Sequence, residues 1–179
     1  MLERKSTVLA VVDVQGKLAE SMHDKESLFN NLRKLIQGIH VLGVPVLWTE
    51  QNPEGLGPTV PDIAELLADL NPIPKTSFSS WRNGQFARAL GDLKRSNVLL
   101  AGIETHICIY QTAVDLLREG YTVETVADAV SSRTPRNREI GLLKIRDAGI
   151  ALTSVETALF ELLGTAKTSE FKDILRIVK

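Results

Sequence analysis

Six short apolar segments, separated by polar loops and by segments with helical spacing, constrain the fold of this 179-residue chain more than any other feature. The first, residues 7–14, is a continuous β-branched run, which is typical of a strand buried on both faces of a parallel sheet. Strands that alternate with helices indicate right-handed βαβ units, so we predict an α/β fold with three layers, α/β/α. The sheet is expected to be doubly wound, Rossmann-like and parallel, with six strands in the order 3-2-1-4-5-6. The other expected strands cover residues 44–49, 73–76, 98–102, 121–126 and 150–153.

The segments between these strands carry leucine and isoleucine at helical spacing and end at glycine or proline. No repeat, low-complexity tract or linker interrupts the pattern, so residues 1–179 are predicted to form a single domain. We expect helices over residues 21–42, 61–70, 85–95, 107–120 and 134–149, and two more that begin near residues 154 and 168.

Composition excludes several classes of function. A net charge of −1 gives no basic surface for nucleic acid or for an anionic membrane. One cysteine excludes an internal disulfide framework and a CxxC metal or redox pair. The only apolar run near the N-terminus, Val8 to Val12, is too short for a signal peptide or a membrane span. We therefore expect a cytoplasmic protein.

The single cysteine, Cys108, follows the fourth expected strand and falls in the first turn of the next helix. Free N–H groups and the positive end of the helix dipole favour a thiolate at such a position. A small buried apolar residue is the commoner fate of a lone cysteine. Asp13 ends the first strand, which the predicted order places beside the fourth, and Lys75 ends the third strand. The topology thus predicts that these three side chains converge at one edge of the sheet.

Such a group of side chains has a clear chemical use. A carboxylate near the thiol can take its proton and return it to a leaving group, and an ammonium supports both anions. Backbone N–H groups of the turn are natural donors to a tetrahedral oxyanion. From the residues alone two alternatives stay open, in which Asp13 caps the next segment and Lys75 is a solvated surface residue.

Other functions lack their residues. A phosphatase of the type with two acids after its first strand would need an acid where Gln15 stands. Neither GxGxxG after the first strand nor GxxxxGK[ST] occurs. The three histidines are scattered, so no metal site is expected; His106 either orients the nucleophile or fixes its turn. Phe78 and Trp81 either line an apolar pocket or pack in the core.

With GIETHIC (102–108), VVDVQ (11–15) and PKTSFS (74–79), the sequence resembles the isochorismatase-like cysteine hydrolases, and the likeness runs nearly from end to end. TEQNPEGLG (49–57), DAVSSR (128–133) and SVETALFEL (154–162) are most similar to the subgroup of isochorismatase-domain-containing proteins. The resemblance implies a catalytic triad of Cys108, Asp13 and Lys75. It also implies a cis peptide bond between Ile103 and Glu104, with the N–H groups of Glu104 and Cys108 as the oxyanion hole. Relatives of this kind usually form dimers or larger homo-oligomers.

Departures from the family narrow the expected function. Nicotinamidases carry a metal-binding Asp and histidines after the second strand, but EQNPEGLG (50–57) has no histidine. We expect neither a metal nor a cofactor. True isochorismatases typically lack the cysteine that is present here. The prediction is a cysteine hydrolase of a small amide-like C–N bond, acting through a thioester-type intermediate, with Gln15, Phe78 and Trp81 in the substrate pocket. The alternatives are a non-catalytic binding or scaffold protein, isochorismatase-type ether hydrolysis, and an oxidation-sensing cysteine.

Overall fold

A six-stranded parallel sheet forms the centre of the molecule, and its strand order is β3-β2-β1-β4-β5-β6. The computed structural model describes residues 1–179. The observed parallel sheet and its strand order confirm the predicted fold class and order. The strands are β1 (Thr7–Val12), β2 (Val46–Gln51), β3 (Ile73–Lys75), β4 (Asn97–Ile103), β5 (Thr122–Ser131) and β6 (Ala151–Thr153).

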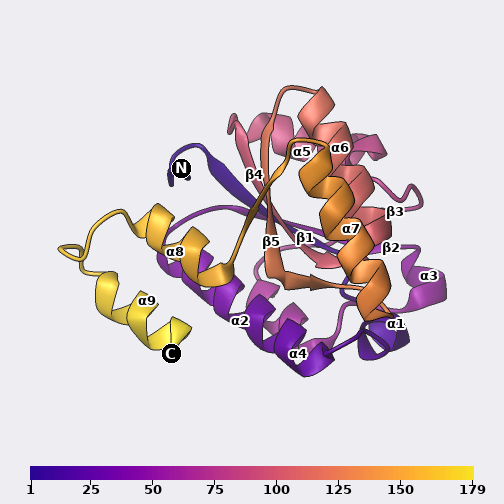
Figure 1. The fold of residues 1–179 in the computed structure, drawn as a ribbon, viewed down its shortest axis with the longest axis horizontal. Helices are drawn as coiled ribbons and strands as arrows, with labels where there is room; N and C mark the ends of the chain where they lie inside the picture. The colour runs from indigo at the N-terminus through magenta and orange to yellow at the C-terminus, as the bar shows by residue number, and fades with distance from the viewer.

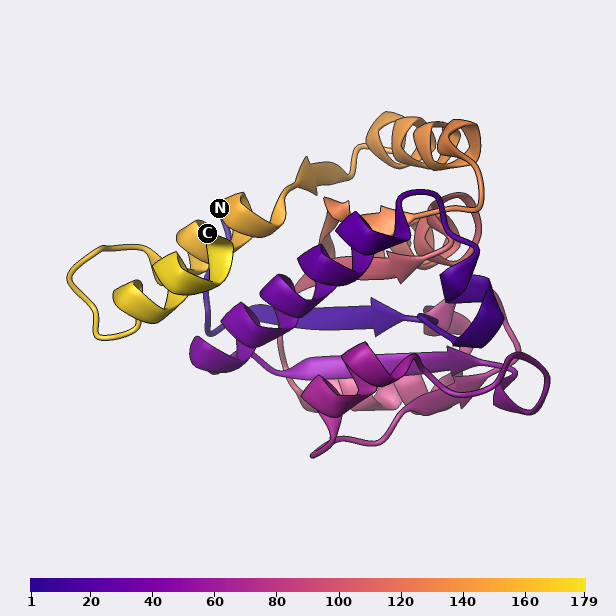
Figure 2. The ribbon, with the colours of Figure 1, turned by 90° about the horizontal axis from the view of Figure 1, so that it is seen from below.

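Helices cover both faces of the sheet (Figure 1). One layer contains α2 (Lys25–Val41), α4 (Pro61–Ala64), α8 (Val155–Leu163) and α9 (Phe171–Val178). The other contains α5 (Gly84–Asp92), α6 (Tyr110–Arg118) and α7 (Pro135–Asp147). Figure 2 shows α8 and α9 beside the end of α2, in agreement with the contacts among these three helices. Short turns complete the chain: α1 (Gly16–Glu20), α3 (Pro53–Leu56), η1 (Glu65–Leu67), η2 (Ser80–Arg82) and η3 (Thr105–Ile109).

Alternation along β1 divides the core into two parts. Leu9 and Val11 pack into the layer of α2 and α8, whereas Val8, Ala10 and Val12 pack into the layer of α5 and α6. All six residues of β1 are buried, which agrees with a strand covered on both faces. No helix is both long enough and apolar enough to cross a membrane.

Several boundaries differ from the sequence-based expectation. The first expected helix, residues 21–42, is α2, which begins only at Lys25, after Asp24 with its left-handed φ of 49°; the short helix α1 lies before the expected range. The helix after β4 does not begin at Ile107; a π-helical turn, η3, comes first, and α6 begins at Tyr110. β5 continues to Ser131, because it resumes pairing with β4 after an irregularity between Leu100 and Gly102.

β1 and β4 approach each other closely at Gly102. A Cβ atom there would lie 2.1 Å from the carbonyl oxygen of Val12, and the φ of Gly102 is +119°. Only glycine meets both conditions. The neighbouring ends of β1 and β4 carry Asp13 and the turn that contains Cys108, so this contact positions the site.

Candidate active site

Asp13, Lys75 and Cys108 meet at the carboxyl edge of the sheet, as the topology predicts. Asp13 follows β1, Lys75 is the last residue of β3, and Cys108 lies in η3 after β4. Their exposed fractions are 2%, 2% and 7%. The Nζ atom of Lys75 lies 2.7 Å from Oδ2 of Asp13.

Lys75 is not a solvated surface lysine. Its ammonium also donates to Oε1 of Gln51 at 2.7 Å and to the carbonyl oxygens of Ser77 at 3.0 Å and Phe78 at 3.1 Å. Four oxygens therefore surround a group that has three N–H bonds. A buried ammonium with this many oxygen partners is held in one place.

Asp13 faces Lys75 and does not cap the next helix. Its φ of 57° is left-handed, which Asp tolerates better than most residues, and α1 has no side-chain cap. Oδ1 of Asp13 accepts a hydrogen bond from the hydroxyl of Thr49 at 2.8 Å. Burial raises the pKa of Asp13, and the contacts with Lys75, Thr49 and Cys108 oppose that rise. The carboxylate is thus a stronger base than an exposed aspartate while remaining paired.

The thiol of Cys108 is protonated in the resting site. Burial and the neighbouring negative charge of Asp13 raise the pKa of Cys108 to about 12, against the opposing effects of Lys75 and the backbone of Glu104. The expectation that a helix N-terminus favours a thiolate here is wrong, because desolvation outweighs the helix ends and the ammonium. A thiol with so high a pKa attacks only where a base removes its proton, and Asp13 lies near enough to this thiol to raise its pKa.

The turn that contains Cys108 is held by contacts with the end of β5 and the chain after it. The peptide bond between Ile103 and Glu104 is cis, as the resemblance implied. Oε2 of Glu104 accepts from the backbone N–H of Arg133 at 3.0 Å and from its Nε at 3.2 Å. Nδ1 of His106 lies 3.0 Å from Oγ of Ser132, so His106 fixes the turn. These contacts bind η3 to the DAVSSR segment.

Gln15 anchors the loop after β2 and is closed to a substrate. Its Nε2 donates to the carbonyl oxygens of Gly57 at 2.7 Å and Gln51 at 3.2 Å, and its Oε1 accepts from the N–H of Gln51 at 2.6 Å. The side chain is fully buried. The expected place of Gln15 in a substrate pocket is corrected accordingly, because neither amide atom is left for a ligand.

Phe78 and Trp81 have different environments. Phe78 is 55% exposed, so its side chain lies at the surface, and its backbone carbonyl oxygen accepts from Lys75. Trp81 packs edge-on against Tyr121, with ring centroids 5.7 Å apart. Tyr121 precedes β5 and lies at the amino end of the sheet. The packing alternative therefore describes Trp81, whereas Phe78 remains a candidate for contact with a substrate.

Thr49 and Gln51 both contact the site, Thr49 through Asp13 and Gln51 through Lys75, although neither was among the residues expected there. The signal was available in TEQN (49–52), because the end of β2 must lie beside the end of β1 in the predicted order. Polar side chains at adjacent carboxyl ends of parallel strands meet at the same edge.

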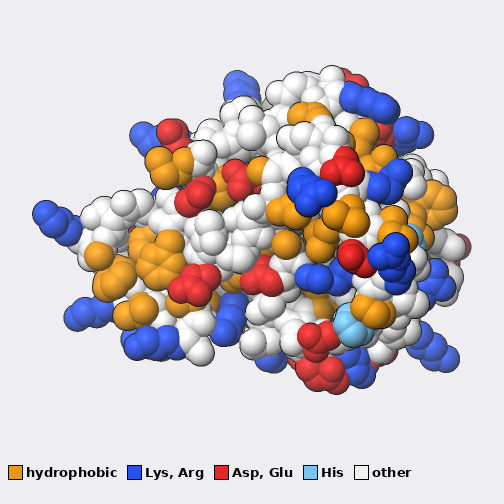
Figure 3. Space-filling view, viewed as in Figure 1, with side chains coloured by type: hydrophobic (Ala, Val, Ile, Leu, Met, Phe, Trp, Pro, Cys, Tyr) orange, Lys and Arg blue, Asp and Glu red, His pale blue; other side chains and the backbone are white.

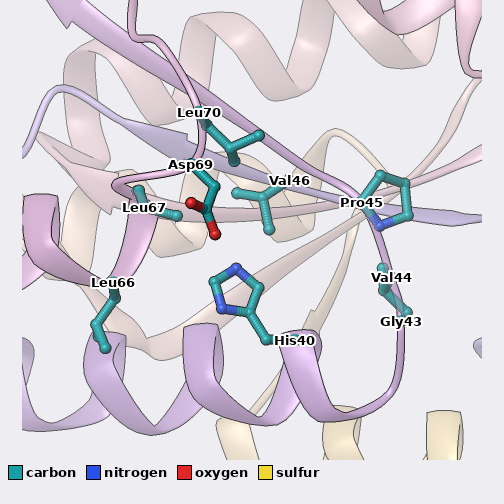
Figure 4. Close-up of a pocket in the computed structure, with 9 residues that line it drawn as sticks. All are labelled: His40, Gly43, Val44, Pro45, Val46, Leu66, Leu67, Asp69 and Leu70. Carbon is teal, nitrogen blue, oxygen red and sulfur yellow. The ribbon is translucent and has the colours of Figure 1, made fainter.

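The cavity drawn in Figure 4, of about 440 Å³, lies at the opposite end of the sheet from the triad. In it His40 and Asp69 point toward each other between apolar side chains. A second hollow of about 350 Å³ includes Lys75 and the polar residues Asn52, Glu54, Thr76 and Asn83. No group of three or more His, Cys, Asp or Glu side chains is placed to hold a metal ion.

Residues 7–157 match the family model of the isochorismatase domain. Isochorismatase domain-containing protein 2 of Xenopus laevis is 39% identical over 179 residues, covering 99% of this chain and 85% of that protein. The secreted isochorismatase effector Isc1 of Phytophthora sojae is 38% identical, covering 97% of this chain and 85% of that protein.

Solved structures agree with this relationship. The MAR1 ribonuclease from Caenorhabditis elegans superposes with a TM-score of 0.92 at 36% identity, covering 99% of this chain and 91% of that one. The YcaC product of Escherichia coli, described as an octameric hydrolase of unknown specificity, has a TM-score of 0.88 at 23% identity, with 93% and 83% covered. The fold is thus the three-layer isochorismatase-like α/β/α fold. The chain belongs to the isochorismatase family of hydrolases.

Proposed function

We propose that the protein is a metal-independent cysteine hydrolase that cleaves a small amide-like C–N bond through a thioester intermediate. The observation that carries this proposal is the buried contact of a protonated thiol with a carboxylate that is itself paired with a lysine. A resting thiol with a raised pKa needs a base beside it, and Asp13 stands there.

In the first half of the reaction, Sγ of Cys108 attacks the substrate carbonyl carbon while Asp13 accepts the thiol proton. The N–H groups of Glu104 and Cys108 hold the negative oxygen of the tetrahedral intermediate. Asp13 then passes its proton to the leaving nitrogen as the C–N bond breaks. An amine leaves, and a thioester remains on Cys108.

In the second half, the oxygen of a water molecule attacks the thioester carbonyl carbon, and Asp13 accepts a proton from that water. Collapse of this intermediate releases a carboxylic acid and returns the proton to the sulfur of Cys108. Lys75, 2.7 Å from Asp13, stabilises the carboxylate whenever it is ionised. Burial of all three groups strengthens these interactions relative to water.

A screen over small amides, carbamates, ureides and nicotinamide tests the proposal, with the Cys108→Ala protein as blank. We expect Cys108→Ala and Asp13→Asn each to lower kcat about 10³-fold or more with the fold intact. The double variant should lose little beyond either single one, because the two groups act as a unit. Full activity in either single variant would overturn the mechanism.

The same proteins test the other candidates. A vinyl ether substrate that is still cleaved by Cys108→Ala would favour isochorismatase-type chemistry driven by Asp13. A binding or scaffold protein would be favoured if no substrate is turned over and if Cys108 is alkylated at the same rate in the wild-type and Asp13→Asn proteins. A short RNA belongs in the screen because the Caenorhabditis elegans relative is named a ribonuclease, although a net charge of −1 does not favour that substrate.

We also propose self-association, which the octameric Escherichia coli relative supports. Figure 3 shows hydrophobic side chains among charged ones over α7. Ile140 and Leu143 of α7 are 37% and 38% exposed, and Leu117 of α6 is 37% exposed. Light scattering of the purified protein at several concentrations measures its mass; a monomer throughout would contradict this. Cytoplasmic residence remains a prediction, since one relative is named a secreted effector.

A further inference from the structure

Thr49 is fully buried in β2, beside the end of β1. Val12 and Thr49 are partners in the parallel register, and the N–H of Asp13 donates to the carbonyl oxygen of Thr49 at 3.1 Å. The hydroxyl of Thr49 donates to Oδ1 of Asp13 at 2.8 Å. The sheet itself therefore fixes this hydroxyl against the carboxylate.

The two oxygens of Asp13 have different partners: the hydroxyl of Thr49 donates to Oδ1, and the ammonium nitrogen of Lys75 lies 2.7 Å from Oδ2. The titratable groups that face Asp13 are Lys75 from β3 and Cys108 from η3. The other buried acids are engaged elsewhere: Glu50 with Thr59, Glu104 with Arg133, and Asp115 with Arg82. Thr49 is thus an uncharged donor to this carboxylate.

We propose that Thr49 is a positioning residue for Asp13, whose hydroxyl holds the carboxylate ionised and in one orientation beside the thiol. The proposal rests on the function proposed above, in which Asp13 is the base. A hydrogen bond to the charged form of a carboxylate favours that form, and burial disfavours it. Without the hydroxyl, Asp13 would hold its proton to higher pH and would be free to turn about its side-chain bonds.

The test uses two substitutions of opposite character. Thr49→Val keeps the shape and removes the hydroxyl, whereas Thr49→Ser keeps the hydroxyl and removes the methyl group. In the pH profile of kcat/KM, we expect Thr49→Val to move the acidic limb upward by about one pH unit, the effect of one hydrogen bond to a charged group. Thr49→Ser should leave that limb in place. Should Thr49→Val fail to fold, Thr49→Ala carries the same expectation.

Alkylation of Cys108 by iodoacetamide provides a readout that needs no substrate. Its rate should fall at low pH as Asp13 becomes protonated, and Asp13→Asn should remove this limb. Thr49→Val should shift the limb upward, and Thr49→Ser should not. If the limb shifts but no hydrolysis is found, the positioning role holds and the proposed function fails. If both limbs stay in place in a folded Thr49→Val protein, or the wild-type protein has no such limb, the role of Thr49 is overturned.

Discussion

Gly141 of α7 lies directly against the backbone of His106, in the turn η3 that contains Cys108. A Cβ atom on Gly141 would be 2.7 Å from the amide nitrogen of His106 and 2.8 Å from the carbonyl carbon of Thr105. Neither neighbouring atom belongs to a flexible side chain, so the contact leaves no room for adjustment. α7 therefore supports η3 from the side, and Cys108 depends on this support for its position.

Substitution of Gly141 by alanine should reveal that support. Alanine is normally preferred in a helix by roughly 1 kcal/mol, but here the clash should destabilise the protein by about 1–3 kcal/mol. Gly91 of α5 is a matched control, because a Cβ there meets nothing within 4 Å. Gly91→Ala should therefore raise the free energy of unfolding in urea, and only Gly141→Ala should lower it and slow hydrolysis. An equal rise in the free energy of unfolding in both variants would contradict the close contact between Gly141 and the backbone of His106.

Gln15→Leu should act through the loop after β2. The substitution leaves the N–H of Gln51 and the carbonyl oxygen of Gly57 without their buried partner. We expect a loss of about 2–4 kcal/mol in unfolding free energy and faster amide exchange around residues 51–57. Gln37, exposed on α2, is the control, and Gln37→Leu should change stability by less than about 0.5 kcal/mol. Unchanged exchange in Gln15→Leu would remove the anchoring role.

Phe78→Ala and Trp81→Ala should separate substrate contact from packing. The ring of Phe78 is largely exposed, so its removal should change stability by less than about 0.5 kcal/mol and raise KM several-fold. Trp81 packs on Tyr121, and its truncation should cost about 2–4 kcal/mol of stability while kcat/KM of the folded protein persists. Thermal unfolding and steady-state kinetics on both variants decide the matter. A large loss of stability in Phe78→Ala and a raised KM in Trp81→Ala would instead assign packing to Phe78 and substrate contact to Trp81.

Stability should depend on Cys108 at alkaline pH. The pKa of this thiol is raised from 9.0 to about 12 in the folded protein, so folding favours the protonated form. The contribution is fully present below pH 9 and is lost as pH rises toward 12. At pH 10 the loss should be about 1 kcal/mol relative to Cys108→Ala, which lacks the titrating group. Urea unfolding of both proteins at pH 8 and pH 10 measures it; parallel changes would show an unperturbed thiol.

The sequence by itself determined the layers, the strand order and the edge where the site lies. Continuous β-branched runs such as residues 7–14 define strands buried on both faces, and the handedness of βαβ units leaves few arrangements for six of them. Adjacent strand ends then bring Asp13 and Cys108 together, and the structure agrees. The resemblance of GIETHIC (102–108) to the isochorismatase-like family predicted the cis peptide bond in the same turn.

Only the tertiary structure decided which groups around that edge are buried, paired or free. Local pattern places Cys108 at a helix start, but burial of this residue in the core desolvates the thiol and keeps its proton. The burial of Gln15 also depends on distant partners, which lie 36 and 42 residues away along the chain. Trp81 likewise packs on Tyr121, which is far from it in the sequence. Burial and pairing arise from contacts between distant segments, which alternation and helical spacing do not encode.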